Sequence, residues 1–340
     1  MEVLRLQFLK RYLLPRLVQY ILVIFIGVTI VFIIPRLMPV DPVQQMINTI
    51  TMRGAYMDPE ALEQLRESLK EMYGLEGGMF TQYVNLWQRL FRGDFGPSLS
   101  QFPTPVIKLI RISLPWTIGL MASTILISWT LGNIFGGLAG FFSHKRWAKI
   151  LENLAMVIRP IPYYIFALVI LIIFAYLLPL FPLAGGFSVG GKVSWSWNFI
   201  VDVIKHAFLP ALSMVVLGTA GWFQTMRLIV SNLVREDHVV YARAGGLPEL
   251  KIAFKYVIRN AMLPQITGLA LSLGQIFGGA LITEIVFSYP GIGGLLYNGI
   301  ISGDYNLIMG ITILSIIAIA TGTLLVDLLY PLFDPRIRYR

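Results

Sequence analysis

Three charged side chains lie inside apolar stretches of this sequence and are the first candidates for chemistry: Arg159, Glu284 and Asp327. A charge inside hydrocarbon is costly, so such residues usually face a pathway or hold a structure together. The guanidinium of Arg159 either faces a pathway or extends to the headgroups. Glu284 precedes a turn that begins at Tyr289, and we expect it to accept hydrogen bonds there, with a proton relay as the alternative. Asp327 is predicted to pair with Arg159 or Arg227.

Groups for catalysis or for metal binding are sparse. His144, His206 and His238 lie far apart and the sequence has no cysteine, which excludes a thiolate or disulfide site and disfavours a preformed metal site. An intramembrane enzyme needs a nucleophile with an acid or base partner at the same depth, and no such set is evident. A phosphate-binding loop of the form GxxxxGK[ST] is absent. We therefore predict no catalytic residue, no metal and no cofactor in this chain.

Aromatic and amide side chains form a second group of candidates. Trp222 and Gln224 either line a conduit or pack between helices, and packing is the preferred interpretation. Two prolines, at 160 and 162, are expected to kink a helix just before Tyr163. Glycines and aromatic residues at 181–205 indicate either an interfacial belt or a substrate contact. The candidate pathway or gate residues are Arg159, Tyr163, Trp222, Gln224, Glu284 and Tyr289.

The composition indicates the elements that must position these residues. With 56% hydrophobic and 13% charged residues and a mean hydropathy of +0.72, the chain is too apolar for a soluble domain. The net charge of +9 is explained by Lys and Arg beside membrane spans, so no nucleic-acid partner is predicted. We expect an all-α membrane protein with six transmembrane helices, near 17–37, 114–142, 150–178, 207–230, 263–287 and 306–329.

The positive charges predict the orientation. They gather in the N-terminal tail, after the second span, between the fourth and fifth spans and in the C-terminal tail, whereas the two short opposite loops hold only Lys192 and Lys205. Both termini are therefore predicted to be cytoplasmic in an inner membrane.

The predicted spans and this orientation divide the chain into five segments. These are a tail at 1–16, a first span at 17–37, an extracytoplasmic segment at 38–112, a five-helix core at 113–330 and a tail at 331–340. The extracytoplasmic segment should hold a helix that begins at Asp58 and Pro59 and ends at Gly74, with a stripe formed by Leu62, Leu65, Leu69 and Met72.

The cytoplasmic loop at 231–262 does not resemble a simple connector. Residues 237–244 predict two helical turns before Gly245 and Gly246, and Pro248 suits the start of a second helix. Small residues near the turn allow another protein to approach closely, although a basic amphipathic helix lying on lipid is the alternative. The apolar face of the second helix is predicted to contain Leu250, Ala253, Phe254, Val257 and Ile258.

Several motifs occur in order along the chain. The cytoplasmic loop carries Tyr241-Ala242-Arg243-Ala244-Gly245-Gly246-Leu247 and then Arg259-Asn260-Ala261-Met262-Leu263-Pro264. Others are Pro39-Val40-Asp41-Pro42, Gly93-Asp94-Phe95-Gly96-Pro97-Ser98, Glu284-Ile285-Val286-Phe287-Ser288-Tyr289-Pro290-Gly291 and Asp334-Pro335-Arg336-Ile337-Arg338.

In these motifs the chain resembles the binding-protein-dependent ABC permeases of the dipeptide/oligopeptide/nickel branch. The family usually has lysine at position 245 and commonly a small residue at position 159, where this chain has Gly245 and Arg159. The resemblance implies the type I importer fold and half of a translocation pathway for oligopeptides or oligosaccharides. A secondary transporter is the alternative, but the coupling-ion groups and repeats it needs are not seen.

The resemblance also implies the partners. They are a homologous second permease, two ATPase subunits that bind ATP and Mg, an extracytoplasmic solute-binding protein and membrane lipid. The ATPase contact is assigned by resemblance to Tyr241, Ala242, Arg243, Ala244 and Gly246.

Overall fold

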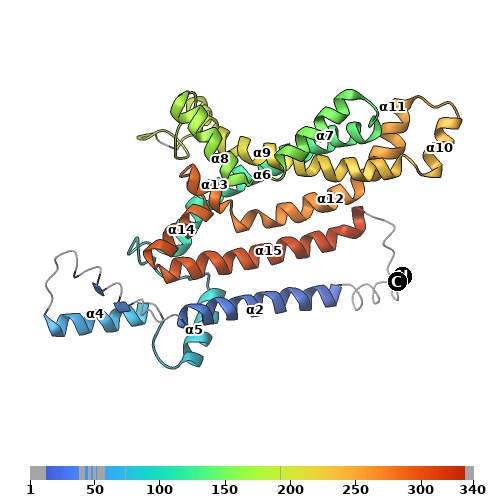
Figure 1. Cartoon of the computed structure of the whole chain (residues 1–340). Helices are drawn as coiled ribbons and strands as arrows, with labels where there is room; N and C mark the ends of the chain where they lie inside the picture. The colour runs from blue at the N-terminus through green and yellow to red at the C-terminus, as the bar shows by residue number, and fades with distance from the viewer. Residues whose placement is uncertain are drawn as a thin grey trace.

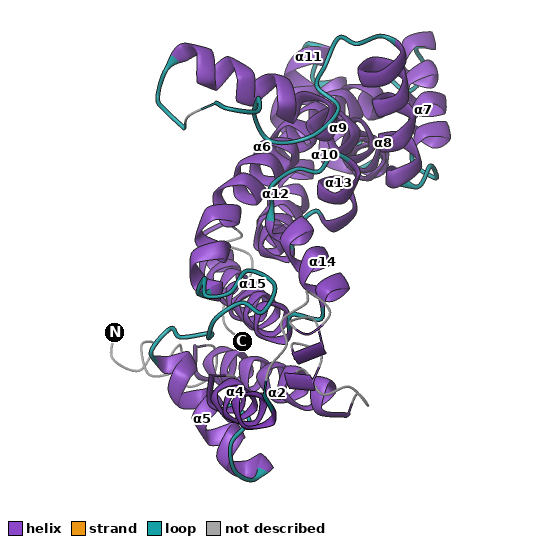
Figure 2. Ribbon diagram, turned by 90° about the vertical axis from the view of Figure 1, so that its left-hand side faces the viewer, coloured by secondary structure: helices purple, strands orange, loops and turns teal. Residues whose placement is uncertain are grey.

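The computed structural model describes residues 13–37, 43–44, 47–48, 51, 58–72, 74–191 and 193–333. In these ranges the chain is helical and has no strand, apart from an isolated bridge between Pro97 and Pro105. Figure 1 shows that the axes of α9, α12, α15 and α2 are roughly parallel, and Figure 2 shows these helices nearly end-on. The prediction of an all-α protein is confirmed.

Four helices are long and apolar enough to cross a membrane within the described ranges. They are α2 (Leu14–Leu37), α6 (Val106–Phe141), α9 (Trp197–Leu233) and α15 (Tyr305–Phe333). Each contains most or all of one predicted span. All four begin or end several residues away from the prediction, because helices continue into the polar region beyond the hydrocarbon.

The third predicted span, at 150–178, is sharply bent rather than straight. It consists of α7 (Arg146–Ile158), α8 (Tyr163–Leu171) and a π-helix, η2 (Ile172–Leu177), and the two halves meet at 96°. The kink expected from the prolines at 160 and 162 is confirmed. Arg159 follows α7 directly, so it lies at the bend between the two halves of this span.

The fifth predicted span, at 263–287, is not one continuous helix. It is divided into α12 (Arg259–Gly274), the 3₁₀ turn η4 (Gln275–Gly278) and α13 (Leu281–Val286). Gly279 has φ +75°, a left-handed conformation that ends the helical run. Within the described residues, the six expected spans are therefore four long helices, one bent pair and one broken segment.

Among its described residues, the segment between α2 and α6 holds the amphipathic helices α4 (Pro59–Met72) and α5 (Met79–Phe91). The predicted stripe of α4 is confirmed, because Leu62, Leu65, Leu69 and Met72 pack in one cluster with Leu99. The helix ends near Gly74, which has φ +62° as expected of a terminating glycine. The sequence analysis did not identify α5.

The motif at 93–98 attaches this segment to the start of α15. Gly93 and Gly96 have φ +70° and +78°, which forms a turn closed by the Gly96 N–H donating to Asp94 at 2.8 Å. Ser98 then donates to the buried carboxylate of Asp304, which also accepts from Ser100 N–H at 3.0 Å. The segment is thereby fixed to the helical core.

Glycines bring α6 and α9 into close contact. Gly132, Gly136 and Gly140 recur every four residues on α6 and therefore lie on one face. A Cβ at Gly136 would lie 2.5 Å from the Phe223 carbonyl oxygen on α9, and one at Gly140 would lie 2.9 Å from the Arg227 carbonyl oxygen. This spacing is the small-residue packing of membrane helices.

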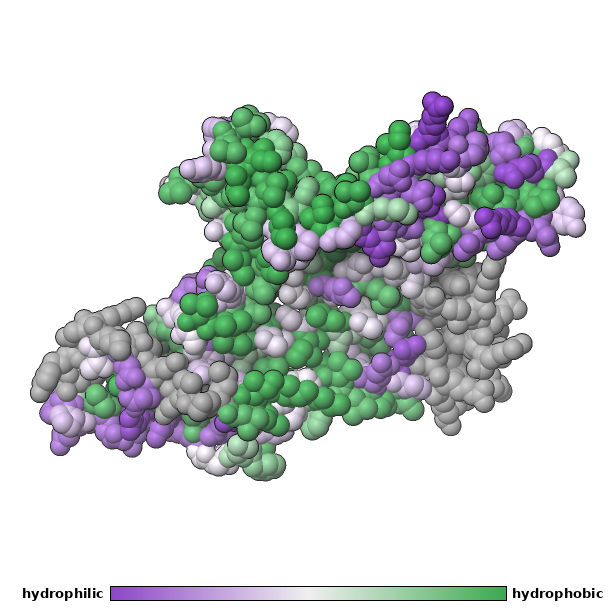
Figure 3. All heavy atoms as spheres, viewed as in Figure 1, coloured by the Kyte–Doolittle hydropathy of each residue, from purple (hydrophilic) through white to green (hydrophobic). Residues whose placement is uncertain are grey.

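Polar and apolar surfaces are separated along the molecule. Figure 3 shows hydrophilic residues over α10 (Asp237–Ala244) and α11 (Glu249–Ile252) at one end and over the α4 region at the other, with hydrophobic residues between them. We call these the α10 end and the α4 end. The apolar middle is the part that a bilayer would cover.

Some predictions fall outside the described residues. These are the motifs at 39–42 and 334–338, the tail at 1–12 and the tail from 334 onward.

Candidate functional site

The predicted two-turn helix at 237–244 is present as α10, at one end of the molecule (Figure 1). Val239 and Ala242 face inward and pack in a core cluster with Met226 and Val257. Tyr241 points the other way and is 76% exposed. One face of α10 therefore packs on the core, and the opposite face is exposed.

The chain reverses direction after α10 through glycine. Gly246 has φ +73°, and a Cβ there would meet no atom within 4 Å. Arg243 then joins the two arms, because its Nε donates to Glu249 Oε1 on α11 at 2.9 Å. Of the predicted contact residues, Tyr241, Arg243, Ala244 and Gly246 are exposed and Ala242 is buried within the chain.

The second helix of this loop matches the prediction in part. It runs as α11, then as the π-helix η3 (Ala253–Ile258), and continues into α12 without a gap. Of the predicted apolar face, Ala253 and Val257 are buried and Ile258 packs against the same cluster. Leu250 and Phe254 are instead 61% and 54% exposed, and Ile252, which was not predicted, is buried.

Arg159 and Gln224 are brought together although 65 residues separate them. The Arg159 guanidinium donates to the Gln224 side-chain oxygen, which links the α7–α8 bend to α9. Trp222 occupies a packing position, since a Cβ on Gly268 of α12 would lie 3.0 Å from its ring. A pathway role for these three residues stays a prediction.

Glu284 lies at the centre of a hydrogen-bonded cluster near the α4 end of α6. Its carboxylate is fully buried and accepts from Thr117 Oγ1 at 2.8 Å and from the Gly294 N–H at 3.0 Å. Thr117 Oγ1 in turn accepts from the Ile292 N–H at 2.8 Å. The expected hydrogen bonds of Glu284 are therefore confirmed, and they fasten α13, the following turn and α6 to one another.

Glycines in the turn make room for this carboxylate. A Cβ on Gly291 would collide with the Glu284 carboxyl group, and one on Gly293 would lie 2.9 Å from Glu284 Oε2. The Tyr289-Pro290-Gly291 motif is thus explained by close approach of backbone to a buried acid.

Aromatic rings cover the cluster. Tyr289 packs edge-on against Trp116 with centroids 5.8 Å apart, and Trp116 stacks on Phe187 at 5.9 Å. Burial raises the pKa of the Tyr289 phenol to about 12, and the nearby Glu284 acts in the same direction. Tyr163 of α8 lies beside the backbone of Ile282 in α13, so it borders the same region.

Part of the aromatic segment at 181–205 packs inward instead of forming a belt. Phe187 contacts Trp116, and Phe181 stacks on Phe208 with centroids 4.6 Å apart. By contrast Trp195 is 98% exposed.

The predicted partner of Asp327 is wrong. Asp327 Oδ2 lies 2.9 Å from Arg16 Nη1 of α2, whereas Arg227 pairs with Glu152 of α7. The first span packs against the last, which the sequence order does not reveal. Arg16 and Asp327 also border a cavity of about 240 Å³ between α2 and α15.

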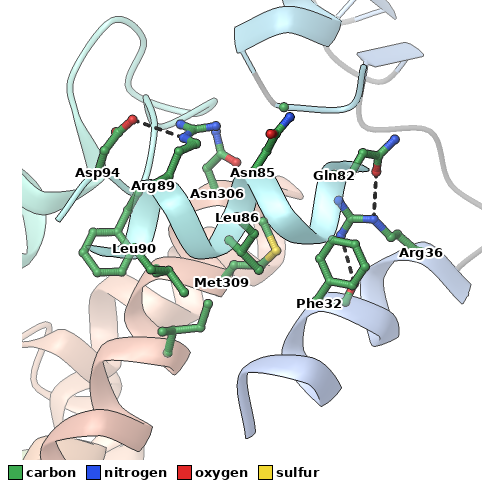
Figure 4. Close-up of a pocket in the computed structure, with 14 residues that line it drawn as sticks. Phe32, Arg36, Gln82, Asn85, Leu86, Arg89, Leu90, Asp94, Asn306 and Met309 are labelled. Atoms are coloured by element: carbon green, nitrogen blue, oxygen red, sulfur yellow. Dashed lines mark hydrogen bonds and ion pairs between the residues drawn. The ribbon is translucent and has the colours of Figure 1, made fainter. Parts of the chain in front are cut away.

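A smaller hollow of about 40 Å³ lies at the α4 end between α2, α5 and α15. Figure 4 shows Arg36 held over the Phe32 ring and bonded to Gln82, with Arg89 bonded to Asp94 on the opposite side. Both guanidinium groups therefore have partners that belong to the packing of α5.

Sequence reasoning missed Thr117 and Asp304, which are both fully buried. Asp304 was detectable, because it follows Gly303 and its side chain accepts from the Leu307 N–H at 3.0 Å as a helix N-cap. Thr117 gave no such signal, since it lies inside an apolar helix. No group of three or more metal-ligating side chains occurs in the described ranges.

A family model described as "Binding-protein-dependent transport system inner membrane component" matches residues 132–339. The chain belongs to this family. It is a multi-pass inner-membrane protein and a permease component of the ABC-importer type. The matched region includes α10, the Arg159 bend and Glu284 with its turn, whereas Thr117 lies before it.

Curated relatives of the permease align with nearly the whole chain. It is 31% identical to the oligopeptide transport system permease protein AppB of Bacillus subtilis, over 93% of this chain and 96% of the relative. It is 31% identical to OppB of Haemophilus influenzae over 97% and 99% of the two chains. The probable D,D-dipeptide permease protein DdpB of Escherichia coli is 27% identical over 91% and 92%.

Proposed function

We propose that this permease forms half of the transmembrane pathway of an ATP-driven importer of oligopeptides. The other half is a homologous permease, and an extracytoplasmic solute-binding protein delivers the cargo. The single observation that carries the proposal is α10, a short helix anchored by Val239 and Ala242 and exposed on its other face. Because α10 is anchored in the core, a partner that displaces this helix also displaces the core residues packed against it. A loop without such packing would move alone.

A displacement of α10 is transmitted directly to the membrane helices. The core cluster beneath α10 includes Phe141 at the end of α6, Val230 of α9 and Ala261 of α12. A partner that moves α10 therefore shifts the ends of three helices together. We assign the contact to two ATPase subunits, one on each permease, with Tyr241, Ala244 and Gly246 on the exposed surface and Arg243 holding the turn.

ATP and Mg bind to the ATPase subunits in this proposal. The sequence of this chain has no GxxxxGK[ST] loop, so its own residues offer no such nucleotide site. The α10 end is cytoplasmic because the short loops there carry Lys145, Arg146, Lys149 and the cations of the α10 loop. The α4 end is then extracytoplasmic, where it meets the solute-binding protein.

The Glu284 cluster is proposed as part of the external gate. Glu284 and Tyr289 hold a turn against α6, and Tyr163 borders it. Arg159, Trp222 and Gln224 lie closer to α10 and are proposed to face the pathway when the helices separate.

Peptide is preferred over oligosaccharide as cargo. The three relatives described above are named as permeases for oligopeptides or dipeptides. An exposed indole such as that of Trp195 can stack on a sugar, but it can equally contact a protein. It therefore does not favour oligosaccharide as the cargo.

The test is ATP-dependent uptake by the intact transporter in membrane vesicles, with a labelled oligopeptide and a labelled oligosaccharide offered separately. We expect peptide uptake that requires ATP, and uptake of the sugar alone would overturn the cargo assignment. An Ala244→Trp variant should insert normally and lose uptake, because the added ring blocks the exposed face of α10. Ser143→Trp, also exposed at the α10 end, is the matched control and should transport normally.

A further inference from the structure

A positive charge lies midway along the bent span. α7 has 13 residues, and α8 and η2 follow the bend with nine and six, so Arg159 stands near the middle of this crossing by residue count. The residue is exposed. Figure 1 shows α7 and α8 diverging from this bend, and Figure 3 shows the surface hollowed between them. A charge at this depth is costly in lipid, so an exposed arginine here needs water or an anion beside it.

Two polar contacts join α7 to α9 next to the bend. The Arg159 guanidinium donates to the Gln224 side-chain oxygen. Arg227 Nη2 lies 2.5 Å from an oxygen of Glu152, which precedes Arg159 by seven residues. Gln224 and Arg227 are three residues apart on α9, so they lie on one face of that helix. Together the four side chains carry two positive charges and one negative charge.

The positive charge that is not compensated belongs to Arg159. Gln224 is neutral, so it orients the guanidinium without cancelling its charge. Glu152 is the nearest acid along the chain and already has Arg227 as its partner. Among the described residues, no carboxylate lies within 4 Å of the Arg159 guanidinium.

The same guanidinium also has donors to spare. It carries five N–H groups in a planar fork, and Gln224 accepts from only one of its nitrogens. A carboxylate matches both the charge and the geometry of the remaining donors, because its two oxygens accept parallel N–H bonds from such a fork. The contacts therefore describe an oriented site for a carboxylate.

We propose that Arg159 belongs to the wall of the pathway and binds the C-terminal carboxylate of the peptide cargo. The proposal rests on the permease function proposed above. Every linear peptide with a free C-terminus carries this group, so the site accepts peptides of different sequence. A neutral oligosaccharide has no such group, and it would leave the charge of Arg159 uncompensated.

Uptake of two matched peptides tests the site. The intact transporter in membrane vesicles would be offered a labelled oligopeptide with a free C-terminus and the same peptide with a C-terminal amide. Because the solute-binding protein also selects cargo, the readout is the carboxylate-to-amide uptake ratio, compared between permease variants that share that protein. Arg159→Gln should lower this ratio about tenfold, since a hydrogen-bonded charge pair is lost. Arg159→Lys should give an intermediate ratio, because lysine keeps the charge without the fork.

Arg146→Gln is the matched control. Arg146 is an exposed arginine at the start of α7, where Lys145 and Lys149 keep the charge that sets the orientation. Its ratio should equal that of the unsubstituted chain. If Arg159→Gln also leaves the ratio unchanged while uptake remains ATP-dependent, the carboxylate site is refuted and the permease function stands. If uptake by the unsubstituted transporter does not require ATP, the permease function itself fails.

Thiol labelling tests the same site without transport. Met156 lies three residues before Arg159 and is 55% exposed, so Met156→Cys in the cysteine-free chain places a thiol beside the guanidinium. An anionic methanethiosulfonate reagent should react there about tenfold faster than a cationic one, after correction for their rates with a free thiol. Adding Arg159→Gln should remove this preference. A saturating amount of the carboxylate peptide should slow the reaction more than its amide does.

Two labelling results would overturn the proposal. If position 156 reacts with neither reagent, in ADP or in ATP with vanadate, the bend faces lipid or another protein rather than an aqueous pathway. If it reacts without a preference for the anionic reagent, an anion such as a lipid phosphate or an acid of the second permease already compensates Arg159.

Discussion

At the residue scale, the buried carboxylate of Glu284 explains why the chain places an acid in an apolar segment. It satisfies the Gly294 N–H and the Thr117 hydroxyl, and Thr117 satisfies the Ile292 N–H. One acid thereby pairs donors from two separate segments of the chain.

Replacing Glu284 by alanine should therefore be costly. The buried donors would lose their acceptor, which costs about 1–3 kcal/mol for each group left unpaired. Thermal unfolding of the purified permease in detergent would measure the loss. Glu67→Ala, on the exposed face of α4, is the control and should change stability by less than about 0.5 kcal/mol. An equal effect of the two substitutions would show that the cluster does not hold the turn.

The residue scale also shows where sequence reasoning ends. Glu284 was recognised as a hydrogen-bond acceptor because an acid before a glycine-rich turn has nearby N–H groups. Thr117 and the true partner of Asp327 were missed, because both depend on which helices pack together. That information is tertiary, and no local spacing contains it.

At the element scale, glycine spacing on α6 determines how closely α9 approaches. Gly136→Ala should lower the stability by about 1–3 kcal/mol, because its Cβ would lie 2.5 Å from the Phe223 carbonyl oxygen and the helices must separate. Gly119→Ala on the same helix is the control, since a Cβ there meets nothing within 4 Å. Thermal unfolding should show Gly119→Ala to be neutral or stabilising. If Gly136→Ala left the stability unchanged, the close approach of α6 and α9 at this glycine would not be important for stability.

The elements were predictable to different degrees. Long apolar runs gave α2, α6, α9 and α15, the glycine pair at 245 and 246 placed the end of α10 correctly, and Pro248 placed the start of α11. The interruption of the fifth span at Gly279 was not predicted, because glycines such as the pair at 278 and 279 are frequent within membrane helices. The buried face of this helix was predicted correctly at Ala253, Val257 and Ile258 but wrongly at Leu250 and Phe254, which are exposed.

At the scale of the whole molecule, the two polar ends predict an orientation that labelling can test. Ser194→Cys, in the exposed loop before α9, should react with a membrane-impermeant maleimide in intact cells. Ser143→Cys, in the exposed loop between α6 and α7, should react only after the membrane is permeabilised. We expect this pattern because the positive charges beside the α10 end favour a cytoplasmic location for that end. The reverse pattern would invert the proposed topology.

The central claim is that a separate ATPase contacts the exposed face of α10, and cross-linking tests it most directly. Tyr241→Cys in the cysteine-free chain would be joined to neighbouring proteins with a short thiol-to-amine cross-linker in membranes that contain the intact transporter. Tyr176→Cys, 71% exposed against 76% for Tyr241 but near the opposite end of the apolar region, is the matched control. We predict an adduct between position 241 and an ATP-binding subunit, and none from position 176. Adducts of position 241 with lipid alone, in membranes where uptake is ATP-driven, would contradict the account.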